Sequence, residues 1–209
     1  LLPMIDKEFP DISLNIIEKQ THEIIETLAN DEIDVGLLAT PLKVPKIFEL
    51  PLYYEPFSLL CRKDHPLAQN KRIKYSSLSL NDIWLLEEGH CLRHQVLDVC
   101  AMKAQSRPPI QSRPARNPSS QVRKFNFESG SLETLKNLVN SFGGYTLLPA
   151  MAAESLGTKT ILIPFERPIP AREIGLVYRR KHYKSSLIEA LGEAILKSIP
   201  EELRKKKKK

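Results

Sequence analysis

The 209-residue chain has few cysteines and lacks the segments that place a protein in a membrane or outside the cell. It has only three cysteines, without an even framework for paired disulfides, and neither a Cys-x-x-Cys pair nor a thioredoxin-like pattern. No apolar run approaches the roughly 18 residues of a membrane span, and no basic-then-apolar leader opens the chain. These absences exclude a disulfide-stapled scaffold and predict a cytoplasmic protein with no membrane association.

Acidic residues are missing from two segments that carry much of the positive charge. The formal net charge is +6, from 31 basic and 25 acidic residues. Residues 105–124 hold four prolines, five basic residues and no acid, and residues 204–209 hold six basic residues. Without them, 20 basic residues remain against 25 acidic ones, which does not resemble a phosphate-binding surface. We predict that 105–124 is a disordered insertion and that 204–209 is a solvated basic tail, with a nucleic-acid contact as the less favoured alternative.

Two of the cysteines, Cys91 and Cys100, are nine positions apart in the stretch EGHCLRHQVLDVC at residues 88–100. On one helix, nine steps would separate their Cα atoms by roughly 13.5 Å and place them on opposite faces. A disulfide tolerates at most about 7 Å between Cα atoms. If this stretch is helical, a bond between the two thiols therefore requires the helix to unwind, and it would act as a conformational switch.

The neighbouring residues favour Cys91 as the attacking thiol. Gly89 breaks the preceding apolar run and would place Cys91 in the first helical turn, where free N–H groups and the helix dipole favour a thiolate. His90, Arg93 and His94 add potential positive charge to that turn, which Glu87 and Glu88 partly offset. A peroxide oxidises a thiolate to a sulfenic acid, which a second cysteine converts to a disulfide. Cys100 follows apolar residues, is expected to be more buried, and has the character of a resolving thiol.

Other interpretations of these residues stay open. A buried cysteine is commonly only a small hydrophobic residue. His90, Cys91 and His94 could bind a metal, because residues four apart share a helical face, but no second Cys/His cluster completes a four-ligand set. We therefore predict no metal and no cofactor. Cys61 follows an apolar run and is predicted to be a core strand residue without chemistry.

The pattern along the chain alternates between strand and helix, which is typical of an α/β fold with right-handed crossovers. In the first part, residues 12–16 alternate as a strand, 22–29 form an amphipathic helix, and 35–38 form a continuous apolar strand of the kind buried in parallel sheets. Further strands are predicted at 57–61, 83–86, 125–127, 145–148 and 174–178, and helices at 91–100 and 132–142. The final helix is expected to open with a capping box at Ser186 and Glu189.

The chain resembles the OxyR family, the peroxide-sensing branch of the LysR-type transcriptional regulators. The run EGHCLR-x-Q at residues 88–95, followed by Cys100, is similar to that family's redox centre. The other segments that resemble the effector domain, in order, are 1–3, 9–10, 20–22, 33–34, 64–66, 130–135, 146–150 and 174–179.

This resemblance implies a fold of two Rossmann-like lobes joined by two crossings, similar to periplasmic binding proteins. Lobe I would comprise residues 1–54 and 174–203, and lobe II would comprise 55–173 and carry the redox cysteines. The reactive site of such folds lies in or near the cleft, at the ends of strands and helices. The implied function is the regulatory domain of a hydrogen-peroxide-sensing transcription factor, which is not an enzyme.

The resemblance also implies roles for individual residues. Cys91 would be the peroxidatic cysteine and Cys100 the resolving one, while Thr21, His90, Arg93 and Arg172 would line or tune the peroxide pocket. Thr21 is also a candidate N-cap for the helix at 22–29. Arg172 could also be a surface charge.

The implied partners are hydrogen peroxide, a second copy in a homodimer that becomes a tetramer in the full-length protein, and a disulfide reductase such as glutaredoxin or thioredoxin. DNA and RNA polymerase would be reached only through the full-length protein. One alternative is an effector domain that binds a small organic ligand in the interlobe cleft, with incidental cysteines. A thiol peroxidase is the least favoured alternative.

Three features of the sequence depart from the family pattern. His94 stands where the family usually has an aspartate, which changes the charge around Cys91. The family's first strand and a peroxide-binding threonine are expected upstream of Leu1. The third departure is the insertion at 105–124.

Overall fold

The computed structural model describes residues 1–79, 82–87, 91–101, 130–179 and 184–204. The predicted insertion at 105–124, the predicted strand at 125–127, the lysines at 205–209 and His90 lie outside the described residues.

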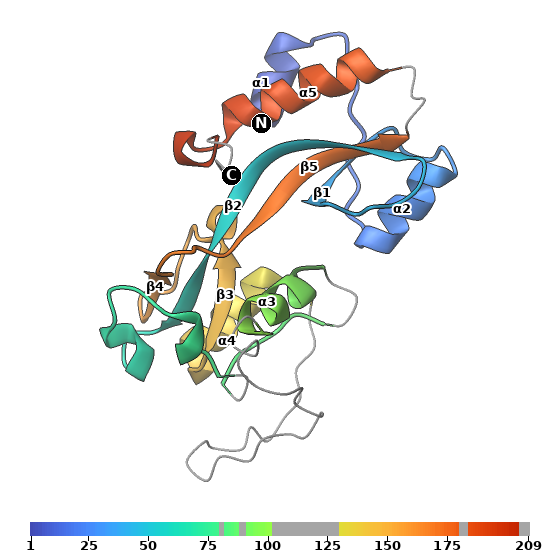
Figure 1. The fold of residues 1–209 in the computed structure, drawn as a ribbon. Coiled ribbons are helices and arrows are strands. Elements are labelled where there is room, and N and C mark those ends of the chain that lie inside the picture. The colour runs from blue at the N-terminus through green and yellow to red at the C-terminus, as the bar shows by residue number, and fades with distance from the viewer. Residues whose placement is uncertain (80–81, 88–90, 102–129, 180–183, 205–209) are drawn as a thin grey trace. The chain divides into compact units, whose positions relative to one another are not determined.

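Two compact units make up the fold, and each is built from helices and strands. The first comprises Leu1–Glu55 with Arg172–Lys209, and the second comprises Pro56–Ala171. Two strands, β2 (Ile47–Arg62) and β5 (Ala171–Arg179), run from one unit into the other (Figure 1). The predicted α/β class, with a chain that crosses twice between lobes, is confirmed.

Unit 1 contains two pairs of packed elements. Helix α1 lies beside α5, and Lys197 Nζ contacts Glu8 Oε2 across them at 3.3 Å (Figure 1). Helix α2 packs on β1, with Leu28 and Leu38 in the small core between them. The elements of unit 1 besides the crossing strands are α1 (Leu2–Glu8), α2 (Thr21–Ala29), β1 (Gly36–Thr40), α5 (Ser185–Ser198) and the 3-10 helix η5 (Glu201–Leu203).

Unit 2 has the larger core of the two. Leu59 and Leu60 of β2 are fully buried there, together with Leu148 of β3 and Phe165. Helix α4 packs along β3. Besides the crossing strands, the described residues of unit 2 form η1 (Pro66–Gln69), η2 (Tyr75–Ser77), α3 (Cys91–Ala101), α4 (Leu132–Phe142), β3 (Tyr145–Pro149), η4 (Ala150–Ala152) and β4 (Thr160–Pro164).

The strands follow the order β1-β5-β2-β3, and β4 also pairs with β2. Strand β1 runs antiparallel to β5, with Gly36 opposite Val177, and β2 runs antiparallel to both β3 and β4. The prediction of a fully buried parallel strand at 35–38 is therefore wrong. Leu37 is 47% exposed, because side chains alternate between the two faces of β1 and α2 covers only one of these faces.

Two other predicted strands are not formed. Residues 12–16 have no regular secondary structure, and Leu14 and Ile16 are exposed. Residues 83–86 make only an isolated parallel bridge, between Ile83 and Tyr145. Alternating or continuous apolar residues do not by themselves make a strand, because the backbone also needs a neighbouring strand to accept its hydrogen bonds.

Helix α4 has the bounds that the sequence predicts. Ser131 Oγ accepts a hydrogen bond from Thr134 N at its start, and Gly143 ends it with a φ of 78°. Such a positive φ is readily reached only without a Cβ atom, so the glycine pair after the helix explains its end.

Two predicted helix caps are wrong. The N-cap of α2 is Gln20, whose N–H donates to Glu23 Oε2 at 2.8 Å, so Thr21 is the first helical residue. Helix α5 begins at Ser185 after the N-cap Lys184, so the residue predicted to cap it, Ser186, lies inside the first turn. At α2 the start is set locally, because Gln20 and Glu23 form a capping box through reciprocal hydrogen bonds.

Gly175 offers a test of how closely the strands approach in unit 1. A Cβ atom there would lie 2.8 Å from the Leu50 carbonyl oxygen. We expect Gly175→Ala to lower the free energy of unfolding by about 1–3 kcal/mol, because a backbone carbonyl cannot move away without separating strands. Urea denaturation followed by circular dichroism measures the change.

The matched control is Gly192→Ala in α5. There a Cβ atom would meet the end of the Leu52 side chain at 3.1 Å, and a side chain can rotate away. The control should change stability by less than Gly175→Ala does. Equal losses in the two variants would contradict this account.

Candidate functional site

Helix α3 carries both Cys91 and Cys100 on one continuous segment, Cys91–Ala101. The stretch between the two cysteines is therefore helical, which is the condition under which a disulfide would require the helix to unwind. Nine helical steps correspond to roughly 13.5 Å along the axis and half a turn around it, well beyond the reach of a disulfide. While α3 is intact, its two cysteines cannot be joined.

Cys91 is the first residue of α3, as its position after Gly89 predicts. The first turn of a helix has N–H groups without intrahelical acceptors and carries the positive end of the dipole, and both favour a thiolate over a thiol. The position of Cys91 in this first turn is what supports an attacking role for its thiol.

Cys100 occupies the opposite end of α3 and is 8% exposed. It belongs to the core of unit 2 together with Val96 and Val99 of the same helix, and it carries a thiol and not a disulfide. Burial is the main cause that raises the pKa of the Tyr145 hydroxyl; a hydrogen bond with the Ser79 backbone opposes the shift, and Cys100 adds a smaller increase. The predicted burial of Cys100 is confirmed.

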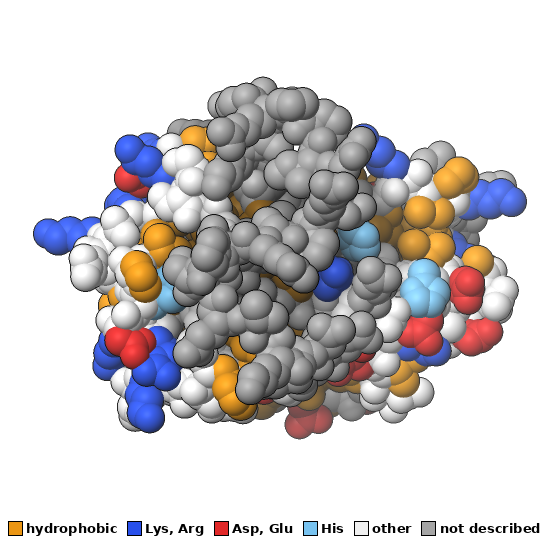
Figure 2. All heavy atoms as spheres, turned by 90° about the horizontal axis from the view of Figure 1, so that it is seen from below, with side chains coloured by type: hydrophobic (Ala, Val, Ile, Leu, Met, Phe, Trp, Pro, Cys, Tyr) orange, Lys and Arg blue, Asp and Glu red, His pale blue; other side chains and the backbone are white. Residues whose placement is uncertain are grey.

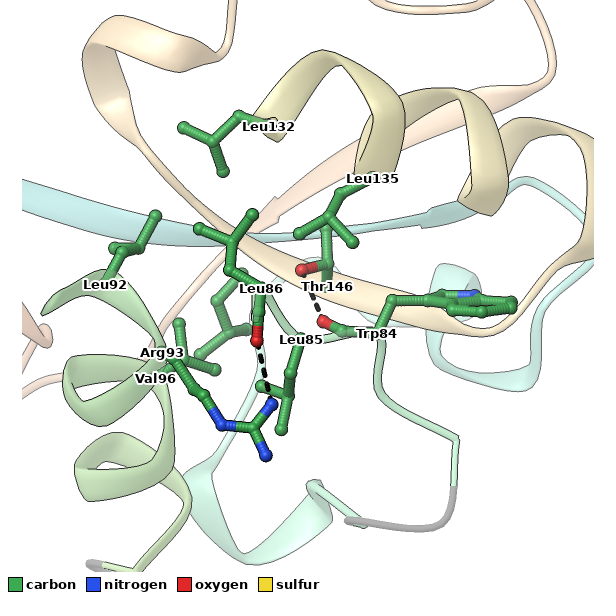
Figure 3. A pocket seen from close by; sticks show the side chains of 10 residues that line it. Trp84, Leu85, Leu86, Leu92, Arg93, Val96, Leu132, Leu135 and Thr146 are labelled. Carbon is green, nitrogen blue, oxygen red and sulfur yellow. Dashed lines mark hydrogen bonds between the residues drawn. The ribbon is translucent and has the colours of Figure 1, made fainter. Parts of the chain in front are cut away.

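Arg93 connects α3 to the segment that precedes it. Its Nη1 donates to the Leu86 carbonyl oxygen at 2.8 Å, and Leu86 is buried. Figure 3 shows this bond closing one side of a small crevice beneath the helix. The sequence indicated a charge near Cys91, but the structure shows that the guanidinium also holds the backbone.

The crevice beneath α3 has room of about 10 Å³ and is lined mostly by apolar side chains. Leu92 and Val96 of α3 face Leu132 and Leu135 of α4 across it (Figure 3). A space of this size holds at most one water-sized molecule, so the crevice does not accommodate an organic ligand.

Gln95 is a candidate residue that the sequence reasoning did not single out beyond its place in the motif. Its Oε1 is buried and accepts no hydrogen bond from any described residue. Gln95 lies four residues after Cys91, and side chains at this spacing share a helical face. Gln95 Oε1 is therefore a buried acceptor to which an O–H group could donate. No sequence pattern distinguishes such an acceptor from an ordinary surface amide.

Two predicted pocket residues, Thr21 and Arg172, belong to unit 1, whereas Cys91, Arg93 and Cys100 belong to unit 2. Thr21 is at the start of α2 and is partly buried. Arg172 is 19% exposed and donates from Nε and Nη2 to Glu55 Oε2, at 2.8 and 2.7 Å. The alternative interpretation of Arg172 as a surface charge is therefore wrong, because it forms an ion pair with a carboxylate that is 1% exposed.

Cys61 is a core residue of β2, as predicted, with no exposed surface. Burial, with a smaller contribution from Asp64, raises the pKa of the Cys61 thiol to about 11. A thiol with such a pKa is almost fully protonated near neutral pH and is a poor nucleophile.

Metal binding finds no support among the described residues, which contain no group of three or more candidate ligands. The proposed set of His90, Cys91 and His94 includes a residue outside the described range, so it stays an alternative interpretation. Within the described part of the chain, no helix is both long and apolar enough to cross a membrane.

Charged side chains of both signs are interspersed on the face shown in Figure 2. A mixed surface lacks the one-sign potential that attracts nucleic-acid phosphates. The described side chains on this face therefore do not form a phosphate-binding patch.

The fold is thus two α/β units joined by two crossing strands, with the helix that carries Cys91 and Cys100 in one of them. The family described as LysR substrate binding domain matches residues 1–199. The chain belongs to the LysR substrate-binding domain family, and the predicted resemblance is confirmed.

Similar proteins have names that refer to hydrogen peroxide or to the regulation of transcription. The "Hydrogen peroxide-inducible genes activator" of Dickeya chrysanthemi is 33% identical over 181 residues, which cover 86% of this chain and 54% of that protein. The "DNA-binding transcriptional dual regulator OxyR" of Escherichia coli K12 is 32% identical over 197 residues, 93% of this chain and 59% of that protein. The chain thus spans a little over half the length of these curated relatives.

The same likeness is found among solved structures. The reduced form of the OxyR regulatory domain from Pseudomonas aeruginosa is similar with a TM-score of 0.77 and 29% sequence identity. That match covers 95% of this chain and 88% of the other. A structure described as the reduced form of OxyR has a TM-score of 0.74 at 32% identity, over 93% of this chain and 85% of that one.

The ion pair of Arg172 with Glu55 predicts a large effect on stability. We expect Arg172→Met to lower the free energy of unfolding by about 3–5 kcal/mol, because the buried carboxylate of Glu55 loses its guanidinium partner. Urea denaturation measures the loss. Lys197→Met is the control, since it breaks an exposed pair and should cost at most about 1 kcal/mol. Similar losses in the two variants would show that burial does not set the strength of the pair.

The raised pKa of the Cys61 thiol predicts that the free energy of unfolding depends on pH. Because the pKa of its thiol is raised from 9.0 to about 11 in the fold, the neutral form stabilises the protein below pH 9, and this stabilisation is lost as pH rises from 9 to 11. Relative to Cys61→Val, the wild type should lose up to about 2–3 kcal/mol over that interval. Urea denaturation of both proteins between pH 8 and 11 measures the difference. Parallel pH curves would contradict the raised pKa.

Proposed function

We propose that this chain is the regulatory domain of a hydrogen-peroxide-sensing transcription regulator, a sensor and not an enzyme. The observation that carries the proposal is that Cys91 and Cys100 share helix α3, at a spacing that excludes a disulfide while the helix is intact. The names of the relatives, which refer to hydrogen-peroxide-inducible genes and to DNA binding, support it.

The proposed chemistry consumes one peroxide for each switch. The Cys91 thiolate attacks one peroxide oxygen, the O–O bond breaks, and the leaving hydroxide takes up a proton to become water. Cys91 is then a sulfenic acid. The sulfur of Cys100 attacks the Cys91 sulfur, the S–O bond breaks, and the hydroxyl leaves with the Cys100 proton as a second water. Two thiols lose two electrons, and the peroxide gains them.

Disulfide formation would require α3 to refold. Cys100 leaves the core of unit 2, and the buried Leu92, Val96 and Val99 on the same helix lose their packing or find new contacts. Each such side chain contributes about 1.5–3 kcal/mol when buried, so the disulfide state must rebuild most of this burial elsewhere. A rearrangement of this size can reach the protein surface.

The proposed output is a change in a homodimer, or in a tetramer of the full-length protein, that alters how its DNA-binding domains meet DNA and RNA polymerase. Glutaredoxin or thioredoxin would reduce the disulfide in the cytoplasm and reset the sensor. Thr21, His90 and Arg172 are proposed to bind or orient the peroxide near Cys91, on the strength of the resemblance to the OxyR family.

One equivalent of hydrogen peroxide tests the proposal directly. We expect peptide mass spectrometry of the treated chain to show a crosslink between Cys91 and Cys100 that dithiothreitol reverses, with Cys61 still a thiol. Cys61 is an internal control, because burial holds its pKa at about 11.

The variant Cys100→Ser separates the two steps. It should stop at the sulfenic acid of Cys91, which dimedone labels, because no resolving thiol remains. Should Cys91 stay unmodified in the wild type at this dose, the redox switch is wrong, and an effector domain for a small organic ligand becomes the better hypothesis.

A further inference from the structure

Residues 82–86, called here the anchor segment, are fixed to the core of unit 2 by hydrogen bonds. Trp84 N donates to the Tyr145 carbonyl oxygen at 2.7 Å, and Tyr145 N donates to the Asp82 carbonyl oxygen at 3.0 Å. Thr146 Oγ1 donates to the Trp84 carbonyl oxygen at 2.9 Å (Figure 3). These hydrogen bonds and the isolated bridge between Ile83 and Tyr145 therefore hold the anchor segment beside β3.

The indole of Trp84 adds a further attachment. Its Nε1 donates at 2.8 Å to the carbonyl oxygen of Gly143, the residue that ends α4. The anchor segment is thus joined to β3 and to the end of α4, neither of which contains a cysteine of the proposed switch.

Arg93 joins this fixed segment to the helix that has to move. It is the third residue of α3, and its Nη1 reaches back to the carbonyl oxygen of Leu86, the last residue of the anchor segment, at 2.8 Å. Figure 3 shows the guanidinium extending from α3 to this carbonyl. Leu86 is 2% exposed, so its carbonyl has little access to water that could replace the arginine.

We infer that Arg93 is a positioning residue of the proposed switch, whose bond to the Leu86 carbonyl holds the first turn of α3 and thereby opposes disulfide formation. This inference rests on the proposed function. A hydrogen bond from a charged donor to a partly buried carbonyl is among the stronger kinds, and it favours only the state in which α3 is folded. Breaking it should therefore favour the disulfide.

The role differs from that of a charge that tunes Cys91. If Arg93 acted only through its positive charge, lysine could replace it, because lysine carries the same charge. A tether depends on the length and planar fork of the guanidinium, which lysine lacks. The variants Arg93→Lys and Arg93→Met therefore separate the two roles.

The equilibrium is measured in buffers of reduced and oxidised glutathione. One oxidised glutathione takes two electrons from Cys91 and Cys100, forms their disulfide, and yields two reduced glutathiones with the two thiol protons. We expect both Arg93 variants to raise the equilibrium constant for disulfide formation about tenfold, which moves the midpoint potential about 30 mV in the negative direction. Quenching in acid and mass spectrometry give the fraction of disulfide.

Asp98→Asn is the matched control, because Asp98 is an exposed charged residue of the same helix, further from Cys91. Its midpoint should equal that of the wild type. The rate at which iodoacetamide alkylates Cys91 across pH reports its thiolate fraction independently. Arg93→Lys should keep the wild-type pH profile while it shifts the midpoint, a combination that a purely electrostatic role would not give.

Three outcomes decide the matter. If the wild type forms no disulfide between Cys91 and Cys100 even in the most oxidising buffer, the proposed function fails, and the tether fails with it. If the disulfide forms but both Arg93 variants titrate like the wild type, or only Arg93→Met shifts, the tether alone is overturned. If Arg93→Met does not fold, as judged by thermal unfolding, Arg93→Lys decides by itself.

Discussion

The rise of the α-helix is the constraint on which the proposed function of this chain depends. Because α3 advances about 1.5 Å per residue, Cys91 and Cys100 cannot bond while the helix is folded. Helix and disulfide are therefore alternative states of one segment. Every contact that stabilises α3 favours the thiols, and the same contacts determine how strongly an oxidant must drive the change.

The contacts of α3 are arranged unequally along its length. Val96, Val99 and Cys100 in its C-terminal half belong to the core of unit 2, whereas its first turn combines the buried Leu92 with the hydrogen bond from Arg93 to the Leu86 carbonyl. In the proposed switch, the end that carries Cys91 is therefore held in part by a polar contact, and the end that carries Cys100 is held by packing. In the proposed sequence of events, Cys91 reacts first, and Cys100 has to leave the core to reach it.

The crossing strands illustrate how unit 1 accommodates charge. Glu55 on β2 pairs with Arg172 on β5. Beside it on β5, Glu173 accepts hydrogen bonds from Thr40 Oγ1, at 2.7 Å, and from the Tyr54 hydroxyl. Both carboxylates are compensated by side chains from neighbouring strands, as buried or partly buried charges require. None of these pairs is visible in the sequence, because their members are up to 133 positions apart.

The sequence by itself determined the local features of this protein. The spacing of its cysteines, the helix α3 with Cys91 at its start, the bounds of α4, the burial of Cys61 and the family all follow from residue patterns, because helical periodicity, glycine and apolar content act over short distances. Only the tertiary structure decided the rest. The antiparallel partner of β1, the missing strand at 12–16, the ion pair of Arg172 and the attachment of Arg93 to Leu86 each depend on which distant or backbone group lies opposite, and no local pattern records that.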